Sequence, residues 1–523
     1  MQDVNWVALI IFVLLFGLIT WLGFAAARWR RGDLDMLHEW GLGGRRFGSL
    51  VTWFLVGGDV YTAYTFIAVP AVAFGAGALA FYAVPYTVMI YPILFVVFPR
   101  LWQISHRKGY VTAADFVRGR FNNRWLALAI AVTGIVATMP YIALQLVGLQ
   151  VVIGGLGISG AGWLGDLPLI IAFIILAAFT YSSGLRAPAA IAIVKDLLIY
   201  VTAIAAIIVI PTQLGGFEKI FAAVPPAKVL LASPPDGSWG SYGAYATLAL
   251  GSAFALFLYP HSLTGVLSAS SGRAVKRNAA LLPSYSFLLG LLALLGFFAV
   301  AAGVDKMPEF AAAFKTFGTN FAVPALFLHS FPSWFVGLAF AAVGIGALVP
   351  AAIMSIAAAN LFTRSIYREF LHGAATDKQE AQMAKWISLV VKFGALIFIL
   401  FVQTKFAIQL QLLGGVWIVQ IFPAVVLGLY TRWFNPWALL LGWTAGTAVG
   451  TWVSVQANFG FFWQLKLFGY GLPGYTALYT LIINIVVAIV ATLLLNAIGA
   501  RDAKDDTLPA DYEPQPATKI EIK

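Results

Sequence analysis

The polar residues best placed to do chemistry lie inside one apolar stretch, residues 51–70 (VTWFLVGGDVYTAYTFIAVP). This stretch is apolar enough to cross a bilayer, yet Asp59 and several hydroxyl groups occupy its middle. A carboxylate at the centre of a membrane helix costs about 2.5–3.5 kcal/mol on insertion scales, and the adjacent Gly57 and Gly58 weaken the helix there. We therefore expect a discontinuous helix that faces a protein-lined cavity.

The side chains expected to face that cavity are Asp59, Tyr61, Thr62 and Thr65. Ionisable groups inside a membrane are functional by default, which favours this interpretation. The alternative is a packing kink in which a neighbouring helix satisfies Asp59.

A second apolar stretch, GSAFALFLYPHS at residues 251–262, is interrupted in a similar way by a Gly-Ser pair and a Tyr-Pro-His run. The two interrupted stretches open two groups of five predicted spans, at about residues 48–212 and 243–430. Interrupted helices at matching places in two halves are typical of transporters built from inverted repeats, with a site near the bilayer midplane.

The composition excludes a water-soluble globule. Of 523 residues, 61% are hydrophobic and 10% are charged, whereas soluble proteins carry about 25% charged residues. The net charge of +11 comes from basic residues in short loops, which indicates membrane topology and no nucleic acid. The chain has no cysteine, which excludes a disulfide, an Fe–S cluster and a thiol nucleophile. We expect an all-α polytopic membrane protein.

About thirteen membrane spans are predicted, since one crossing needs about 20 residues. They cover approximately residues 5–27, 48–70, 78–101, 125–154, 164–183, 188–212, 243–268, 279–302, 333–363, 385–404, 407–430, 436–457 and 475–498. In this count most loop arginines fall on one side of the membrane. The positive-inside rule then predicts an N-terminus outside and a cytoplasmic C-terminus.

Residues 1–500 are expected to form a single transmembrane transporter domain. The polar, proline-containing stretch 501–523 predicts a disordered cytoplasmic tail. Two outer loops, at about residues 213–242 and 303–332, contain short apolar segments that could lie flat as interfacial helices or lids. The sequence contains no phosphate-binding loop and no metal-ligand cluster, so we expect no enzyme activity and no cofactor.

Four motifs resemble the solute:sodium symporter family. They are GLGGRRFGS, KGYVTAADFVRGRF, IMSIAAANLFTRSIYREF and IFPAVVLGLYTRWFNPWALLLGWTAG, which occur in the family's order across roughly residues 40–445. The resemblance implies a LeuT-like fold with two inverted five-helix repeats. Two segments, GGDVYTAYTFIAVPA and SGLRAPAAIAIVKDLLIY, are most similar to the bacterial monocarboxylate permease branch of the family. This resemblance implies a substrate like lactate or pyruvate.

The resemblance also implies a cation site. Its ligands would be backbone carbonyls near Gly58, Tyr61 and Ala352 and the hydroxyl of Ser355, which as hard oxygen donors suit Na+. Where the family usually has a second hydroxyl residue, this chain has Ile356, whose side chain cannot coordinate a cation.

The sixth predicted span departs from the family as well, because Lys195 precedes the family's Asp at Asp196. An ammonium in an apolar span needs a partner. One hypothesis is that Lys195 reaches the cation site and replaces sodium with its own charge, so that transport is coupled to H+, with Asp59 or Asp196 as the paired acid. The alternative is that Lys195 extends to the lipid headgroups near the cytoplasmic end.

A small monocarboxylate needs a few polar groups from several helices. The candidate substrate-binding residues are Tyr61, Thr62, Thr65, Tyr141, Gln145, Tyr259, His261 and Gln411. Each could instead be an ordinary packing residue of a membrane helix.

The sequence therefore predicts a multi-pass transporter of the bacterial inner membrane that imports a small monocarboxylate with a coupling cation, H+ or Na+. Its expected partners are that substrate, the cation and the lipid bilayer. A symporter for alanine, another amino acid or acetate, and a membrane sensor that does not transport, remain alternatives.

Overall fold

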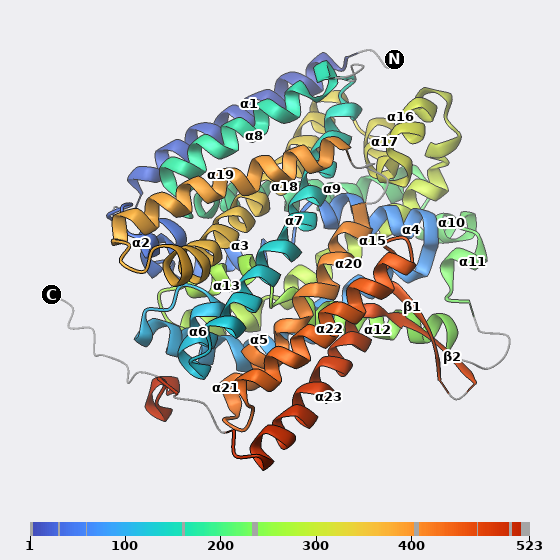
Figure 1. Ribbon diagram of the computed structural model, residues 1–523. Helices are drawn as coiled ribbons and strands as arrows, with labels where there is room; N and C mark the ends of the chain where they lie inside the picture. Colours follow the sequence, from blue (N-terminus) through green and yellow to red (C-terminus); the bar gives the residue numbers. More distant parts are fainter. Residues whose placement is uncertain are drawn as a thin grey trace.

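The computed structural model describes residues 4–29, 32–58, 60–158, 163–232, 239–401, 407–467, 469–500 and 505–513. Long helices run roughly side by side and make up most of the chain (Figure 1). They are α1 (Trp6–Ala25), α5 (Ala83–Lys108), α7 (Arg124–Gly155), α8 (Trp163–Ser183), α9 (Arg186–Gln213), α12 (Gly240–Leu256), α15 (Pro283–Ala302), α18 (Ser333–Phe362), α19 (Asp377–Phe401), α20 (Ala407–Ile418), α22 (Pro436–Gln456) and α23 (Thr476–Ala497).

Shorter helices connect or interrupt these. They are α2 (Leu37–Leu42), α3 (Ser49–Gly57), α4 (Val69–Ala76), α6 (Ala113–Phe121), α10 (Phe217–Ala223), α11 (Pro226–Val229), α13 (Pro260–Leu267), α14 (Gly272–Leu281), α16 (Ala311–Phe317), α17 (Ala322–Ser330) and α21 (Gly428–Tyr430). The helices α10 and α16 are the two apolar loop segments for which the sequence predicts flat helices or lids.

Within the described residues, 11 helices are long and apolar enough to cross a membrane, or 12 when the bent pair α12 and α13 counts as one span. This count treats Tyr64–Lys108, which holds α4 and α5, as one run of 45 residues. The sequence divides the same residues between its second and third spans. Thirteen spans therefore stay a prediction, although every predicted span contains a helix.

Helix α18 forms the centre of the bundle. Its most apolar stretch is 94% buried, because α1, α7, α9 and α19 pack around it. The corresponding stretches of α1 and α23 are mostly exposed at the periphery, where large apolar side chains such as Trp21 would face lipid. The polar groups that α9 and α7 direct inward are therefore shielded from lipid by this packing.

The first broken span consists of α3, a turn, a π-helical segment at Tyr64–Ala68, and α4. Regular helix stops at Gly57 because two consecutive glycines lower its stability. Gly58 is also required sterically, since a methyl group there would lie 2.2 Å from the Phe54 carbonyl oxygen and 2.8 Å from Lys195 Nζ. Asp59 lies outside the described residues. The predicted discontinuity of this span is confirmed.

The second broken span is the pair α12 and α13, which meet at an angle of 47°. Pro260 occupies the first turn of α13, where a missing N–H removes no helical hydrogen bond. Residues 257–259 form the turn between the two halves, and the Leu258 N–H still donates to the Ala255 carbonyl at 3.1 Å. The chain therefore breaks where the Tyr-Pro-His run predicts it.

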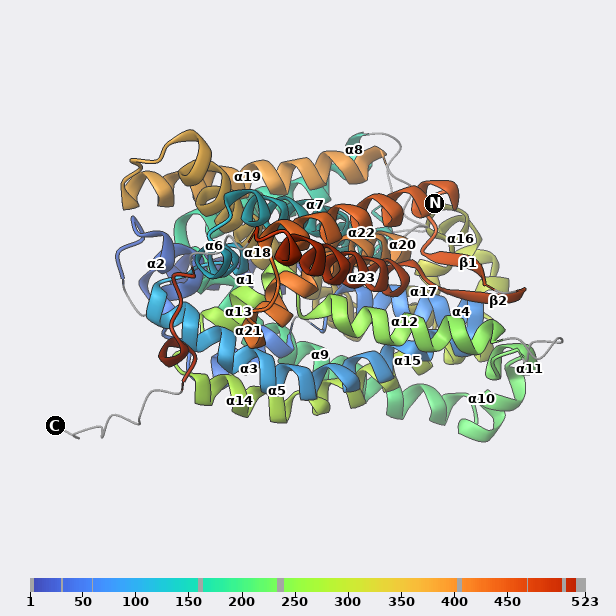
Figure 2. The ribbon, with the colours of Figure 1, turned by 60° about the horizontal axis from the view of Figure 1, so that its bottom comes forward.

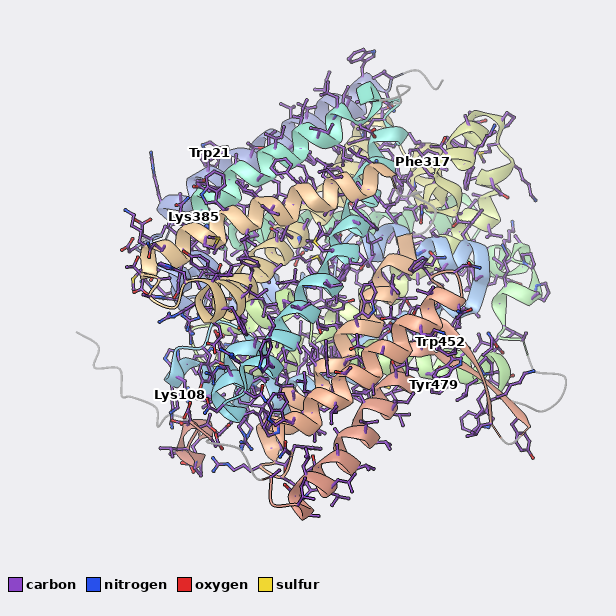
Figure 3. All side chains as sticks on the ribbon, viewed as in Figure 1. Trp21, Lys108, Phe317, Lys385, Trp452 and Tyr479 are labelled. Atoms are coloured by element: carbon purple, nitrogen blue, oxygen red, sulfur yellow. The ribbon has the colours of Figure 1, made fainter. Side chains whose placement is uncertain are left out.

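The two ends of the bundle differ in charge. We define the basic face as the end that carries Arg107, Lys108, Arg120, Arg364 and Arg432, formed by α2, α6 and the turn after α21. Figure 3 shows Lys108 and Lys385 toward this end and Phe317, Trp452 and Tyr479 toward the other. The described N-terminal and C-terminal segments lie at opposite ends of the bundle (Figures 1 and 2).

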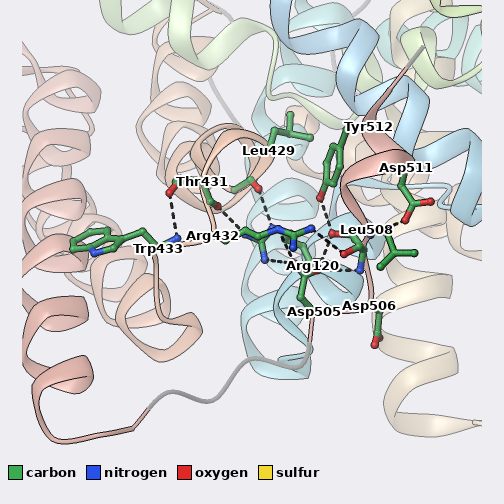
Figure 4. Close-up of polar contacts among 12 residues, drawn as sticks. Arg120, Leu429, Thr431, Arg432, Trp433, Asp505, Asp506, Leu508, Asp511 and Tyr512 are labelled. Carbon is green, nitrogen blue, oxygen red and sulfur yellow. Dashed lines mark hydrogen bonds and ion pairs between the residues drawn. The ribbon is translucent and has the colours of Figure 1, made fainter. Parts of the chain in front are cut away.

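Two features correct the sequence predictions. Strands β1 (Phe462–Leu467) and β2 (Tyr470–Tyr475) form an antiparallel hairpin at the end opposite the basic face, so the fold is not purely helical. Residues 505–513 are packed against the basic face rather than disordered, because arginine and lysine side chains bind their carboxylates and carbonyls (Figure 4). The other residues of the predicted tail lie outside the described residues.

Candidate functional site

Lys195 of α9 reaches into the break of the first broken span. Its Nζ donates to the carbonyl oxygens of Gly58 at 2.6 Å and Tyr61 at 3.1 Å. Regular helix stops at the break, where the Gly58 carbonyl also accepts from the Tyr61 N–H at 3.2 Å, and the carbonyl end of a helix attracts positive charge. The lysine side chain is completely buried, which contradicts the alternative that it extends to the headgroups.

The neighbouring Asp196 supplies the negative charge. Its Oδ1 lies 2.8 Å from Lys195 Nζ, and its Oδ2 accepts a hydrogen bond of 2.7 Å from the hydroxyl of Tyr285 on α15. Asp196 is completely buried as well. A buried charge is stable only when it is paired and hydrogen-bonded, and this pair meets both conditions.

Tyr61 joins this cluster through its side chain. Its hydroxyl donates to the Tyr285 carbonyl at 3.2 Å, and the two rings lie 4.4 Å apart between centroids. The ring of Tyr200, one turn beyond Asp196 on α9, lies 5.9 Å from that of Tyr61. We call Lys195, Asp196, Tyr61 and Tyr285, with the Gly58 carbonyl, the ionic cluster.

The other half of the predicted cation site is on α18. The hydroxyl of Ser355 donates to the Ala352 carbonyl at 2.8 Å within that helix. Gly346 is one residue of α18 near the break, because a methyl group there would lie 3.9 Å from the Tyr61 carbonyl oxygen. The structure thus brings Gly58 and Tyr61 together around Lys195, and a ligand role for Ala352 and Ser355 stays a prediction.

Three predicted substrate residues bind the freed backbone of the break. The Gln145 side-chain oxygen, on α7, accepts from the Ala63 N–H at 3.1 Å. Thr62 accepts from the Tyr64 N–H at 3.0 Å, and the Thr65 hydroxyl donates to the Val60 carbonyl. These contacts satisfy polar groups that would otherwise be buried without partners.

Four other predicted substrate residues gather at the second broken span. The rings of Tyr141, Tyr259 and His261 lie 5.3 Å from one another in each pair. The Tyr259 hydroxyl donates to the backbone carbonyl of Gln411 on α20 at 3.2 Å. We call these four residues the aromatic cluster.

Gln411 offers a free acceptor in this cluster. Its side chain is 4% exposed, and no described residue donates a hydrogen bond to its Oε1. A buried amide oxygen without a donor costs about 1–3 kcal/mol, so a bound molecule with an O–H group would relieve that cost.

The cavities lie unequally on the two sides of the clusters. A cavity of about 270 Å³ opens along α4 on the side away from the basic face, and it is lined by Ala68, Gly75, Thr319, Asn320, Gln409 and Phe461. On the basic side, the space between α6, α7, α13 and α18 measures about 20 Å³. Of these two cavities, the larger one therefore lies on the side opposite the basic face.

Sequence reasoning missed Tyr285 and Gly346. Tyr285 lies 89 residues from Asp196 in the chain, so only the packing of α15 against α9 brings them together. A tyrosine at the start of an apolar helix is a common membrane residue and gives no local signal. Gly346 could have been found as the small residue on α18 that lets the broken span approach closely.

The chain is similar to known proteins in sequence and in fold. Residues 40–446 match the sodium:solute symporter family. A monocarboxylate transport permease protein of Rhizobium johnstonii is 51% identical over 497 residues, which are 95% of this chain and 98% of that protein. The uncharacterized symporter YodF of Bacillus subtilis is 35% identical over 450 residues, 85% of this chain and 87% of that protein.

A solved structure also matches. The substrate-bound outward-open state of a Na+-coupled sialic acid symporter has a TM-score of 0.73 and covers 94% of this chain and 98% of its own. At 15% sequence identity, this likeness shows a shared fold and nothing about the ligand. The LeuT-like architecture expected from the sequence is thereby confirmed.

Proposed function

Because this chain belongs to the sodium:solute symporter family, we propose that it imports a small monocarboxylate, such as lactate or pyruvate, across the bacterial inner membrane together with a coupling cation. The relative at 51% identity is named as a monocarboxylate permease, which supports this substrate class. The basic face would be cytoplasmic by the positive-inside rule.

The coupling ion is the proton. The observation that carries this proposal is the Lys195 ammonium, which binds the Gly58 and Tyr61 carbonyls where the family resemblance places a sodium ion. While Lys195 carries its proton, its positive charge opposes the entry of a second cation at that point. On α18, the buried Ile356 stands where the family usually has a second hydroxyl residue, and its side chain supplies no oxygen.

Among the described residues, the titratable groups around this ion pair set the pH dependence. They are Asp196 beside Lys195, Tyr61 in the break, Tyr285 bonded to Asp196, and Tyr200, whose ring lies against that of Tyr61. On α18, the uncharged Gly346 lies close to the Tyr61 carbonyl oxygen. When Lys195 carries its proton, it holds the two carbonyls of the broken span together. When it releases the proton, its neutral amine binds the two carbonyls more weakly, and the half-helices move apart more easily.

The aromatic cluster would hold the substrate. The free Gln411 oxygen suits the hydroxyl of a 2-hydroxy acid, and the N-terminal end of α13 beside His261 favours a carboxylate. The aromatic cluster contains no Lys, Arg, Asp or Glu side chain. A small ligand would be bound there by a few neutral polar groups in a mostly apolar pocket.

Uptake of labelled lactate into proteoliposomes tests the function, with an inward proton gradient and an inward sodium gradient applied separately. We expect accumulation with the proton gradient alone. Lys195→Met should abolish it while lactate exchange persists. Lys392→Met is the matched control, because Lys392 is another fully buried lysine, bonded only to Ser388 of its own helix among the described residues.

Each other outcome identifies what is wrong. Accumulation that requires sodium refutes the proton as coupling ion. Equal losses in Lys195→Met and Lys392→Met refute the special role of Lys195. Uptake of alanine or acetate in place of lactate refutes the substrate class, and binding without any transport would favour a sensor.

A further inference from the structure

Tyr285 connects the ionic cluster to the second half of the chain. It is fully buried at the start of α15, and its hydroxyl donates to Asp196 Oδ2 at 2.7 Å. The same hydroxyl lies 3.5 Å from the Trp53 carbonyl oxygen on α3. One phenol group therefore touches both α9 and the first half of the broken span.

The space for this ring is created by Gly57. A methyl group at Gly57 would lie 2.3 Å from Cε2 of Tyr285, so no larger residue fits without moving the ring. On its other side the ring packs against Tyr61, and the Tyr285 carbonyl accepts from the Tyr61 hydroxyl. The ring is thus fixed on both sides of the break.

A fixed hydroxyl on one carboxylate oxygen determines where the other oxygen points. With Oδ2 held by Tyr285, Oδ1 of Asp196 faces the ammonium at 2.8 Å. Without that donor, the buried carboxylate would lack a hydrogen bond on Oδ2, and rotation toward another donor would take Oδ1 away from Lys195.

We propose that Tyr285 is a positioning residue for proton coupling, holding Asp196 in the orientation that pairs with Lys195. This inference rests on the proposed function, because it concerns the same ion pair. Tyr285 touches neither the substrate nor the transferred proton, and acts through the carboxylate.

The test compares Tyr285→Phe with Tyr91→Phe. The Tyr91 hydroxyl is also buried, and it bonds Ser286, the next residue of α15, at 2.6 Å. Both variants lose one buried hydroxyl at the same helix, but only Tyr285 reaches Asp196. We expect Tyr285→Phe to lower proton-driven lactate accumulation at least fivefold with little change in lactate exchange, and Tyr91→Phe to leave the ratio of the two unchanged.

A second measurement keeps the inference testable if Tyr285→Phe does not fold. Replacing Tyr285 by 3-fluorotyrosine keeps the shape and makes the hydroxyl more acidic, and should shift the pH profile of uptake; the same change at Tyr91 should not. Equal effects at the two positions would overturn the inference. If the unchanged protein shows no proton-driven uptake, the proposed function fails instead.

A different observation carries a second inference, at the basic face. Asp505 bridges Arg120 of α6 at 2.9 Å and Arg432 at 3.3 Å, and Lys108 of α5 binds Asp511 at 3.1 Å. Figure 4 shows Arg120 and Arg432 converging on Asp505 from separate elements. The carboxylates of this segment are thus paired with the arginine and lysine side chains of the basic face.

This segment is anchored by apolar burial too. The Tyr512 ring is 7% exposed and lies beneath the Arg100 guanidinium, whose central carbon is 4.7 Å from the ring centroid. The Tyr512 hydroxyl bonds that of Thr507 at 2.9 Å, and Thr507 is 1% exposed. Residues 505–513 are therefore held against the basic face both by two buried side chains and by two paired carboxylates.

The segment crosses the junction of the two predicted repeats. Arg100 and Lys108 of α5, with Arg120 of α6, belong to the first repeat, whereas Arg432 directly follows the second. Arg120 also donates directly to the carbonyls of Gly428 at 3.1 Å and Thr431 at 2.8 Å. An inner opening that separates α6 from residues 428–432 would therefore break the Asp505 bridge together with these two bonds.

We infer that residues 505–513 form a latch that slows opening of the basic side. The chain has no cysteine, so one introduced cysteine reports that opening without background. Ala357 lines the 20 Å³ space on the basic side and is buried. In Ala357→Cys protein, reaction with a membrane-impermeant maleimide applied from the basic side measures how often that side opens.

Asp505→Asn and Arg432→Gln should each raise the labelling rate at least threefold. Asp506→Asn is the matched control, because Asp506 is exposed and its contacts to Gly119 and Lys108 use its backbone. Equal labelling in all three variants and the parent would overturn the latch, as would slower labelling after Asp505→Asn.

Discussion

The two broken spans interrupt a helix in similar ways but gather different chemistry. At the first, Lys195 and Asp196 bring a buried ion pair to the carbonyls of Gly58 and Tyr61. At the second, three aromatic rings and Gln411 surround the turn between α12 and α13, with no charged side chain among them. In the proposed function, cation coupling therefore centres on the first break and substrate binding on the second.

Two structurally similar helix breaks can therefore have different chemical roles within one fold. Both breaks expose helix ends, which can bind charge of either sign. What each break binds depends on the side chains that neighbouring helices direct toward it. Changes at one break should therefore alter coupling, while changes at the other should alter affinity.

The largest effect is expected from Gly58→Ala. The added methyl would lie 2.2 Å from the Phe54 carbonyl oxygen and 2.8 Å from Lys195 Nζ, so the break must distort. Gly265→Ala in α13 is the control, because its methyl would meet a side chain, Val56, at 3.1 Å. We expect uptake to fall at least 100-fold in the first variant and less than threefold in the second. Similar losses would remove the distinction between the two breaks.

A smaller effect is expected from Gln411→Leu at the aromatic cluster. Loss of one hydrogen bond to the substrate costs about 1–1.5 kcal/mol, which corresponds to a KM for lactate roughly tenfold higher. The pH dependence of uptake should stay unchanged, because Gln411 has no contact with the ionic cluster among the described residues. A shifted pH profile in this variant would mean that the two clusters act as one site.

The smallest effect is expected from pH at the latch. Burial raises the pKa of the Asp511 carboxyl, but a hydrogen bond from the Leu508 N–H and the Lys108 ammonium outweigh it, so the net pKa lies below its ordinary value. A lowered folded pKa means that the contribution is complete above the ordinary value of 3.8 and is lost only below it. The labelling rate of the double variant Ala357→Cys/Asp511→Asn is divided by that of the single variant Ala357→Cys. We expect this ratio to stay constant between pH 5.5 and 8. A difference that grows with falling pH in this range would contradict this.

Much of the architecture follows from local sequence. Gly57, Gly58 and Pro260 predict both breaks, because helix weakening is a property of the residues themselves. The sequence also predicts that Lys195 either reaches the first break or extends to the headgroups. The signal is a lysine within an apolar span, which needs a partner.

Long-range packing and helix register could not be read in the same way. Tyr285 reaches Asp196 only through the arrangement of α15 and α9, and Gly346 comes close to the break only through the packing of α18. Residues 505–513 have the composition of a disordered tail. Their order depends on Arg120, Arg432 and Lys108, which lie hundreds of positions or several elements away.

The separation of Lys195 from Gly58 has a consequence for biosynthesis. The lysine that occupies the break is made 137 residues after Gly58. At about 5–20 residues per second, the ribosome needs roughly 7–27 s to cover that distance. During that interval the first broken span is already synthesised, while its carbonyls lack the ammonium that binds them in the finished protein. We expect this span to wait beside the insertion machinery, shielded from lipid, until α9 emerges and completes it.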